Sequence, residues 1–341
     1  MIRANPAARP LVSVLLPTYH YARYLPEAIE SVLAQDYPNL EIIISDDASP
    51  DGSADILRAY AARDPRIRAV AHEQNLGMVA NWNWCLQQAR GTYVKYLFGD
   101  DRLASPHAIS RLVDLLESSP RASLAASARV LIDHDSRVTG VWNDLRQDRT
   151  LGGRRAILDC LFHNRNLIGE PSAVLFRRDA ALRGFSPWLR QLVDMEMWFH
   201  LLLQGDLAYT AEPLCAFRRH GAQQTAVNRA ARTGDLEMVH IITRYLERKE
   251  LRREAALGEF GYRQIIFRSA HYLRKAARHQ PEFAPLADQL EQSLPWRWRA
   301  PCWVAHRVTR PFENLARSVQ KRLDRDSVRQ APTLFNSLPA D

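Results

Sequence analysis

The stretch VSVLLPTYHYARYLPEAIESVLAQDYPNLEIIISDDASPDGS, residues 12–53, decides the fold. It opens with an apolar run at 12–16 and contains a second one at 40–45, and both runs are typical of strands buried in a sheet. Between them apolar residues recur at the spacing of one helix face, and Pro38 marks the end of that helix. The order strand, helix, strand predicts a β-α-β unit with parallel strands. The apolar face of the helix consists of Leu25, Ala28, Ile29, Val32 and Leu33.

The same alternation continues as far as about residue 131 and becomes irregular after it. Apolar periods of helix and strand alternate, so the sequence predicts an α/β fold with a largely parallel sheet. The further helices and strands that we expect cover 53–62, 67–71, 78–89, 92–98, 172–176 and 194–203.

The chain of 341 residues is long enough for one core domain and an appendage. Residues 1–10, with two prolines, predict a disordered lead-in, and residues 11–230 carry the α/β pattern. Residues 231–341 predict a helical, basic extension, because 231–292 favour helices and the following stretch places tryptophans among arginines.

Composition and charge restrict the class of protein. Hydrophobic residues make up 46% of the chain and charged residues 25%, as in soluble globular proteins. The net charge of +8 favours an anionic partner, either a phosphate-bearing substrate or a lipid surface. No helix-turn-helix, zinc-finger or RNA-stacking signature points to nucleic acid.

The sequence also predicts a compartment. The best long apolar stretch, 197–217, is interrupted by charged residues, so we expect no segment that spans a bilayer. Residues 1–17 lack the apolar region and cleavage site of a secretory signal. Four scattered cysteines without a C-x-x-C spacing argue against a zinc site and a disulfide framework. We therefore expect a cytoplasmic protein.

Two pairs of adjacent acids follow predicted strands. Asp46 and Asp47 come after one strand, and Asp100 and Asp101 come after another. In an open parallel sheet, ligands collect beyond the carboxyl ends of the strands, where both pairs are expected. Acids that cap helices or lie solvated in a loop are the common alternative. The shared sheet edge favours a site for Mg²⁺ or Mn²⁺, which takes one or two protein carboxylates together with substrate phosphates and water.

A third acid, Asp194, begins the helix predicted in LVDMEMWFHLLLQG, residues 192–205. An ordinary first-turn acid occupies the same position, so the local pattern leaves a structural and a catalytic role open. Farther along, an apolar run ends in the cationic cluster Arg218, Arg219 and His220. A solvated basic turn explains that cluster equally well.

Segments of the chain, taken in order, resemble the successive signatures of family 2 glycosyltransferases with the GT-A fold. They are the stretch at 12–53, LFGDD at 97–101, VDMEMWFHL at 193–201 and FRRHGAQQT at 217–225. The resemblance covers about residues 11–225. It implies a Rossmann-like nucleotide-diphospho-sugar transferase fold with a C-terminal helical extension. It also implies a nucleotide-sugar donor, a divalent cation and a single inverting displacement.

The resemblance assigns the donor site to the first segments. Asp47 is expected to accept the N–H of the base imide, Asp100 to lie near the ribose and Asp101 to bind the metal. Many members carry a further acid two positions before this pair, where this chain has Phe98, so fewer metal ligands are present. The residues expected to line the nucleotide pocket are Pro17, Thr18 and Tyr19.

The later segments are expected to act on the acceptor side. Asp194 matches the acid of the family's Glu-Asp motif and is the expected catalytic base, with Val193 in place of the usual Glu. His220 lies in a segment like the Arg-x-His element and is expected near the diphosphate or the metal. The segment GEPSAVLFRR resembles one that lines the acceptor site, and its candidates are Glu170 and Ser172.

The expected reaction moves a sugar from a nucleotide diphosphate, UDP or TDP, to a hydroxyl of a saccharide or lipid-linked saccharide in bacterial surface polysaccharide assembly. A nucleotidyltransferase would show a Gly-rich phosphate loop after the first strand, where this chain reads LPTYHYARY. A dinucleotide dehydrogenase would show G-x-G-x-x-G after a strand. A degenerate homologue that acts as a membrane-associated assembly partner without catalysis stays open.

Residues 295–325 predict peripheral attachment to an anionic membrane surface, on the inner face of the cytoplasmic membrane. Aromatic rings suit the headgroup boundary, and the interleaved arginines attract anionic lipid. The alternative is that the tryptophans pack onto the catalytic domain while the arginines stay solvated. The aromatic residues concerned are Trp296, Trp298, Trp303 and Phe312.

Overall fold

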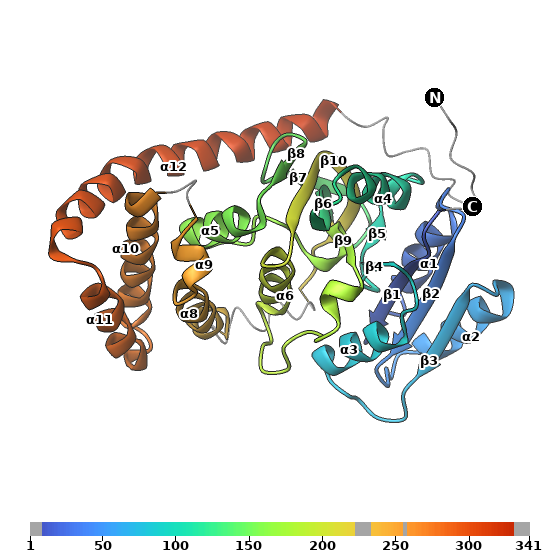
Figure 1. Ribbon diagram of the computed structural model, residues 1–341. Coiled ribbons are helices and arrows are strands. Elements are labelled where there is room, and N and C mark those ends of the chain that lie inside the picture. Colours follow the sequence, from blue (N-terminus) through green and yellow to red (C-terminus); the bar gives the residue numbers. More distant parts are fainter. Residues whose placement is uncertain (1–8, 222–232, 255–257, 331–341) are drawn as a thin grey trace.

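The computed structural model describes an α/β domain followed by a group of helices, as the sequence predicts (Figure 1). The described residues are 9–221, 233–254 and 258–330. Most of the predicted lead-in, the end of the segment at 217–225 and the last eleven residues of the predicted extension lie outside them.

The described strands form one sheet with mostly parallel neighbours. Its order is β3-β2-β1-β4-β9-β6-β10-β5, with β7 on β6 and β8 on β10. The first four strands run parallel, β6 and β10 are also parallel, and β9 runs antiparallel between β4 and β6. The strands are β1 (Val12–Thr18), β2 (Leu40–Asp46), β3 (Ile67–Ala71), β4 (Tyr93–Tyr96), β5 (Arg102–Leu103), β6 (Ala122–Ile132), β7 (Val138–Trp142), β8 (Arg149–Leu151), β9 (Val174–Arg177) and β10 (Asp206–Arg218).

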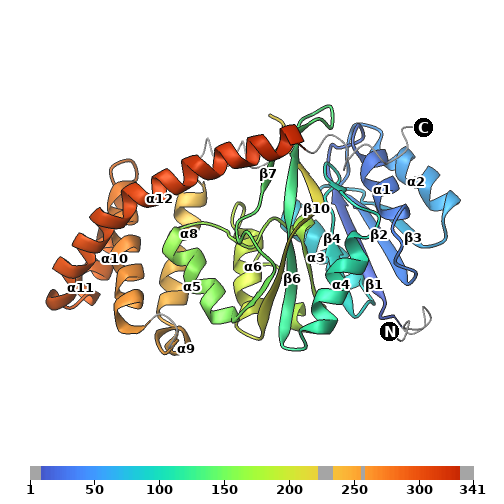
Figure 2. The same cartoon turned by 90° about the horizontal axis from the view of Figure 1, so that it is seen from above.

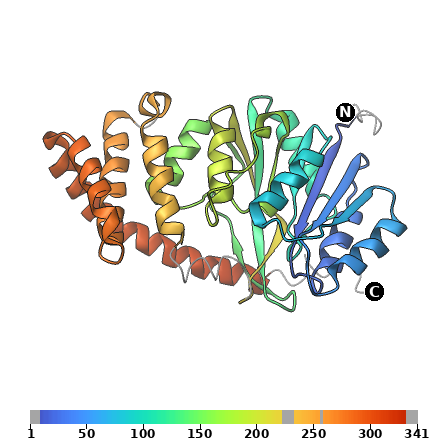
Figure 3. The ribbon, with the colours of Figure 1, turned by 90° about the horizontal axis from the view of Figure 1, so that it is seen from below.

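Helices cover both faces of the sheet and extend beyond it (Figures 2 and 3). The α-helices are α1 (Leu25–Leu33), α2 (Ser53–Arg63), α3 (Met78–Gln88), α4 (Ala108–Ser118), α5 (Gly153–His163), α6 (Val193–Leu202), α8 (Thr233–Leu246), α9 (Lys249–Arg252), α10 (Gly258–Ala276), α11 (Ala284–Ser293) and α12 (Trp296–Gln330). Short 3₁₀ turns are η2 (Pro171–Ala173), η3 (Asp179–Ala181) and η4 (Pro281–Phe283).

Side-chain alternation along β1 divides the core between the two faces. Val14 and Leu16 join the apolar cluster under α1, α2 and α4, whereas Leu15 joins the cluster under α3, α5 and α6. Successive side chains of a strand point to opposite faces, so a strand buried on both faces reads as a continuous apolar run. This is why residues 12–16 predicted the strand.

The helices after residue 233 share the second of these clusters. Tyr245 of α8 and Ile265 of α10 are buried together with side chains of α5 and α6. Figure 3 shows α3, α6, α5 and α8 in a row on this face. One apolar cluster therefore continues from the sheet into the C-terminal helices, and the domain boundary that we expect near residue 230 stays a prediction.

The longest helix, α12, contains Pro301 and Pro311, and the sequence did not predict it as one helix. It leaves the C-terminal helices and continues alongside β7 (Figures 1 and 2). Across the ranges that the structure describes, no helix has both the length and the apolar character needed to cross a membrane.

Candidate active site

The acidic pairs lie where the parallel strands β1, β2 and β4 end side by side. Thr18 closes β1 and pairs with Asp46 at the end of β2. A Cβ atom at Gly99 would lie 2.7 Å from the Thr18 hydroxyl, so only glycine allows the turn after β4 to come this close. The Thr18 hydroxyl is buried and has no hydrogen-bond partner among the described residues. A bound ligand normally satisfies a polar atom of this kind.

Asp47 is held by the loop that leads into α3. Its two carboxylate oxygens accept the backbone N–H groups of Leu76 and Gly77 at 2.6 and 3.0 Å. Its carbonyl accepts the Asn75 side-chain amide at 2.9 Å. Each carboxylate oxygen has a second lone pair, so these bonds leave Asp47 able to accept a base imide. That role stays a prediction.

Asp101 is buried at the turn after β4 with both oxygens engaged. One oxygen accepts the Ser172 hydroxyl at 2.5 Å, and the other accepts the backbone N–H of Arg218 at 2.8 Å. Burial and the adjacent Asp100 raise the pKa of Asp101 well above its ordinary value. The carboxylate is thus fixed by β10 and by the turn before β9, and an incoming cation would relieve the cost of its burial.

Asp100 belongs to a cluster of rings on the other side of the turn. Its Oδ2 atom lies 3.2 Å from Nε2 of His220. The ring of His220 lies 5.9 Å from Tyr21 and 5.3 Å from Tyr24. Burial and the charge of Asp100 raise the pKa of Tyr21, so its hydroxyl stays protonated and bonds to Asp100. The structure therefore brings His220 to the acidic pair, and it adds Tyr21, for which the sequence had no signal.

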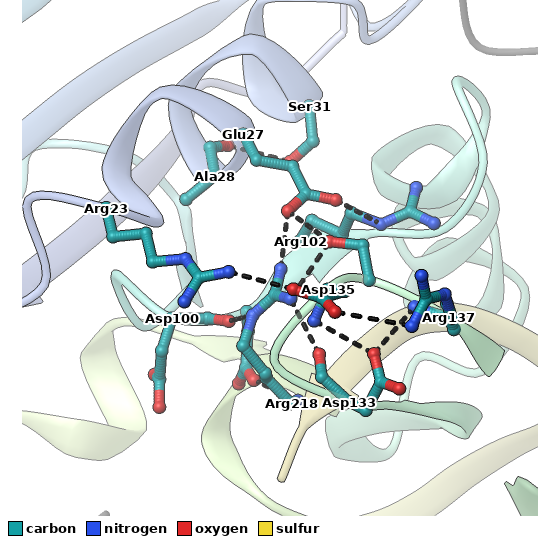
Figure 4. Close-up of polar contacts among 12 residues, drawn as sticks. Arg23, Glu27, Ala28, Ser31, Asp100, Arg102, Asp133, Asp135, Arg137 and Arg218 are labelled. Carbon is teal, nitrogen blue, oxygen red and sulfur yellow. Dashed lines mark hydrogen bonds and ion pairs between the residues drawn. The ribbon is translucent and has the colours of Figure 1, made fainter. Parts of the chain in front are cut away.

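Arg218 is fully buried and connects the turn that contains Asp100 and Asp101, the acidic turn, to neighbouring elements (Figure 4). Its Nε donates to the Asp100 carbonyl at 2.7 Å, and its Nη1 donates to the Asp133 carbonyl at 2.8 Å. Its Nη2 pairs with Glu27 at the start of α1, and Glu27 also pairs with Arg102 at 2.9 Å. The guanidinium group thus bonds to groups from several elements, and it positions the turn.

Lys95 is a buried cation behind the acidic turn that the sequence reasoning missed. Its exposed fraction is 0%, and its ammonium donates to the carbonyls of Tyr96 and Ser172. Burial lowers the pKa of Lys95 to about 8. Ser172 also donates its hydroxyl to Asp101, so Lys95 fixes the backbone of the residue that orients this carboxylate. A lone charge inside the apolar run YVKYLF was the available signal.

Asp194 lies at the start of α6, as predicted, and two hydrogen bonds hold its carboxylate. Its Oδ1 accepts the Met195 backbone N–H at 2.7 Å, and its Oδ2 accepts the Asn166 amide at 3.1 Å. Burial, and then the charge of Glu170, raise the pKa of Asp194 to about 7. A carboxylate with a pKa near 7 takes and returns a proton readily at neutral pH.

Glu170 lies near both Asp194 and Asp101, because its charge raises the pKa of each. Its carboxylate pairs with buried Arg129, at 2.6 Å from Nε. The backbone before it is fixed, since Gly169 adopts φ of +129° and its carbonyl accepts Trp198 Nε1 at 2.9 Å. Asp194 and Asp101 therefore lie near the same charged side chain, Glu170. No sequence pattern predicted that these two acids lie near a common residue.

The remaining nucleotide-pocket candidates lie at the end of β1. Pro17 is buried opposite Ser45 of β2, and Tyr19 is 48% exposed beyond the strand end. An exposed ring at this edge is available for a planar base. Phe98, which replaces the further acid of many members, packs against Trp82 of the core, with the two ring centroids 4.7 Å apart and the rings tilted.

The geometry of this site can be compared with known proteins. A family model described as Glycosyl transferase family 2 matches residues 13–183, which is about half of the chain. The chain belongs to glycosyl transferase family 2. An uncharacterized protein of Mycobacterium tuberculosis is 34% identical over 254 residues, which is 71% of this chain and 77% of that protein. The putative teichuronic acid biosynthesis glycosyltransferase TuaG of Bacillus subtilis is 31% identical over 203 residues, covering 59% and 75%.

Solved structures show the same fold for this glycosyltransferase. TarS 1–349 of S. aureus, in complex with UDP-GlcNAc, superimposes with a TM-score of 0.63 at 17% identity, covering 94% of this chain and 92% of that TarS fragment. The mannosyltransferase PcManGT of Pyrobaculum calidifontis, in complex with GDP-Man and Mn²⁺, gives 0.54 at 19% identity, covering 91% and 89%. The predicted GT-A fold with C-terminal helices is thus confirmed.

The residues at the acidic turn fit a divalent cation. Within the described ranges, no three His, Cys, Asp or Glu side chains already form a metal cluster. Mg²⁺ and Mn²⁺ in such enzymes need only one or two protein carboxylates, because substrate phosphates and water complete the shell. The carboxylates of the acidic pair are the kind of donor that these ions accept, and the imidazole of His220 lies beside them.

Proposed function

We propose that this glycosyltransferase is an inverting enzyme that depends on a divalent cation, Mg²⁺ or Mn²⁺. Its donor is a UDP- or TDP-sugar, and its acceptor is a hydroxyl of a saccharide or lipid-linked saccharide in bacterial surface polysaccharide assembly. It works on the cytoplasmic side of an anionic membrane.

The proposal rests on two acids near Glu170, Asp194 and Asp101, to which we assign different roles. Asp194 has a pKa of about 7, which suits a proton acceptor. Asp101 is buried in the turn after β4, with its oxygens oriented by Ser172 and Arg218. Burial raises the pKa of both carboxylates. Only a proton acceptor with a pKa near 7 or a bound cation makes use of such a site, so we assign the first role to Asp194 and the second to Asp101.

The reaction follows from these positions as one displacement. Asp194 accepts the proton of the acceptor hydroxyl while the acceptor oxygen forms its bond to the anomeric carbon. The bond between that carbon and the phosphate oxygen breaks, and its electron pair leaves with the nucleoside diphosphate. Attack opposite the leaving group inverts the anomeric carbon. A cation at Asp101 supplies charge stabilisation to the leaving diphosphate when it is bound.

The relatives support parts of this proposal. TarS binds UDP-GlcNAc, and PcManGT binds GDP-Man with Mn²⁺, so structures of this fold accept nucleotide sugars and a divalent cation. TuaG is named as a putative glycosyltransferase of teichuronic acid biosynthesis. These facts favour nucleotide sugars as donors and a cell-surface glycan as the acceptor.

Thermal unfolding with UDP, TDP and GDP, each with Mn²⁺ or EDTA, tests the donor and the metal. A nucleotide at 100 times its Kd stabilises the native state by about 2.7 kcal/mol, which raises the melting temperature. We expect the increase for UDP or TDP with Mn²⁺, and its loss with EDTA or in Asp101→Asn. Asp55→Asn, at a carboxylate exposed on α2, is the matched control and keeps the increase.

Two results would contradict the proposal. An equal increase in melting temperature with EDTA and with Mn²⁺ would show that nucleotide binding does not depend on a metal. Turnover of a nucleotide sugar followed by NMR reports the anomeric configuration of the product, and a product that retains the donor's configuration would exclude a single displacement.

A further inference from the structure

The exposed side of α12 carries an apolar face made of large side chains. Val304, Val308, Phe312 and Leu315 are 51%, 57%, 67% and 62% exposed. They recur at intervals of four, four and three residues, which places them on one side of a helix. We call these four residues the α12 apolar face.

The opposite side of the same helix packs on the protein. The carbonyl of Cys302 accepts the Gln264 amide at 3.2 Å, and Glu313 pairs with Arg268 of α10 at 2.8 and 2.9 Å. Trp298 also turns inward and lies 5.8 Å from Phe260. Trp298 therefore packs within the C-terminal helices, on α10, and is not a ring for the headgroup boundary. The helix is anchored, and its apolar face points outward.

In the sequence, exposed arginines flank the residues of the α12 apolar face. Arg307 and Arg310 are exposed on α12, and Arg307 lies 5.2 Å from the ring of Trp303, which is 52% exposed. Between 296 and 313 the helix has four arginines and one acid, Glu313, which Arg268 neutralises. This part of α12 therefore combines an exposed apolar face with an excess of positive charge along the helix.

We propose that the α12 apolar face and its flanking arginines form a docking surface for an anionic lipid bilayer, with the helix lying in the plane of the interface. Apolar side chains enter the boundary of the acyl chains, and arginines reach the phosphates beside them. A second copy of the chain fits less well, because a two-fold contact would bring the same arginines against each other.

The position of α12 links this surface to the active site. The helix runs alongside β7, and the turn between β6 and β7 bonds to Arg218 through Asp133 and Ser136 (Figures 2 and 4). Arg218 in turn holds the acidic pair. If the proposed function holds, docking brings a lipid-linked acceptor to the enzyme, but binding to lipid does not depend on that function.

Co-sedimentation of the full chain with vesicles tests the surface. The vesicles are pure phosphatidylcholine, or phosphatidylcholine with 30% phosphatidylglycerol, in 0.1 M salt. We expect binding to the anionic vesicles and at least tenfold weaker partition in Val308→Glu/Phe312→Glu. In Arg307→Glu/Arg310→Glu each arginine should account for about a fivefold loss on anionic vesicles.

Leu182→Glu is the matched control, because Leu182 is 72% exposed on the catalytic domain and lies far from α12 in the sequence. It should bind like the parent protein, and unchanged melting temperatures show that all variants fold. Absence of parent binding to anionic vesicles overturns the proposal, and so does an equal loss in Leu182→Glu. A dimer that Val308→Glu/Phe312→Glu dissociates, without vesicle binding, assigns the face to a second copy.

Discussion

The pKa of Asp194 leads to a quantitative prediction for the rate of transfer. The carboxylate must be ionised to accept a proton, and its environment raises its pKa from 3.8 to about 7. About one molecule in eleven is ionised at pH 6 and about ten in eleven at pH 8. We therefore expect kcat/KM to rise about tenfold between these two pH values, with a midpoint near 7.

Two substitutions should move this midpoint in opposite directions. Glu170→Gln removes the negative charge that raises the pKa of Asp194, so the midpoint should fall. Asn166→Ala removes an amide that bonds to the carboxylate at 3.1 Å, so the midpoint should rise. A change of one pH unit corresponds to about 1.4 kcal/mol, which is the size of one hydrogen bond to a charged group.

The assay follows the release of nucleoside diphosphate from pH 5.5 to 8.5 at several donor concentrations. Asp194→Asn is the reference, because it keeps the shape and removes the proton acceptor. Its turnover should fall by about 10² or more and lose the dependence on pH near 7, while its donor affinity stays unchanged. A flat profile in the parent protein, or midpoints that move the same way in both variants, would show that another group takes the proton.

Further predictions concern stability and positioning. The raised pKa of Asp194 means that the folded state binds the proton of this carboxyl more tightly than the unfolded state does. The stability that this proton contributes is therefore lost as the pH rises from about 4 to about 7. Asp194→Asn should melt at a higher temperature than the parent protein at pH 8, and equal melting temperatures would contradict this. Lys95→Met removes the donor to the Ser172 carbonyl, and calorimetry should show roughly tenfold weaker Mn²⁺-dependent UDP binding, about the contribution of one charged hydrogen bond. Arg218→Lys cannot bridge all of its acceptors and should lower the free energy of unfolding in urea by about 3 to 5 kcal/mol; a loss below 1 kcal/mol would remove it from its positioning role.

Local sequence patterns predicted the helices and strands of the α/β domain and the candidate site residues at the strand ends. The predicted strand at 12–16 became β1, and the helix expected at 194–203 became α6, displaced by one residue at each end. In a parallel sheet the ends of β1, β2 and β4 meet whatever the details of packing, so Asp47 and the acidic pair were predictable neighbours.

The irregular region behaved differently. The strand expected at 172–176 forms as β9, two residues later and antiparallel to β4 and β6. A short apolar run predicts a strand but carries no information about its direction, which depends on the partners that the chain brings beside it. Proline usually interrupts a helix, so the two prolines within α12 are the reason that the sequence did not predict it as one helix.

The sequence by itself determined that this chain is an α/β glycosyltransferase of family 2, because apolar periodicity and the order of its motifs are local properties. Only the tertiary structure decided what surrounds each acid. Ser172 reaches Asp101 across 71 positions, and Arg218 reaches Glu27 across 191. The pKa of Asp194 depends on its burial and on Glu170, a residue 24 positions earlier in the chain. Burial and Coulomb interactions act through space, so the roles of these side chains became definite only when folding placed distant segments together.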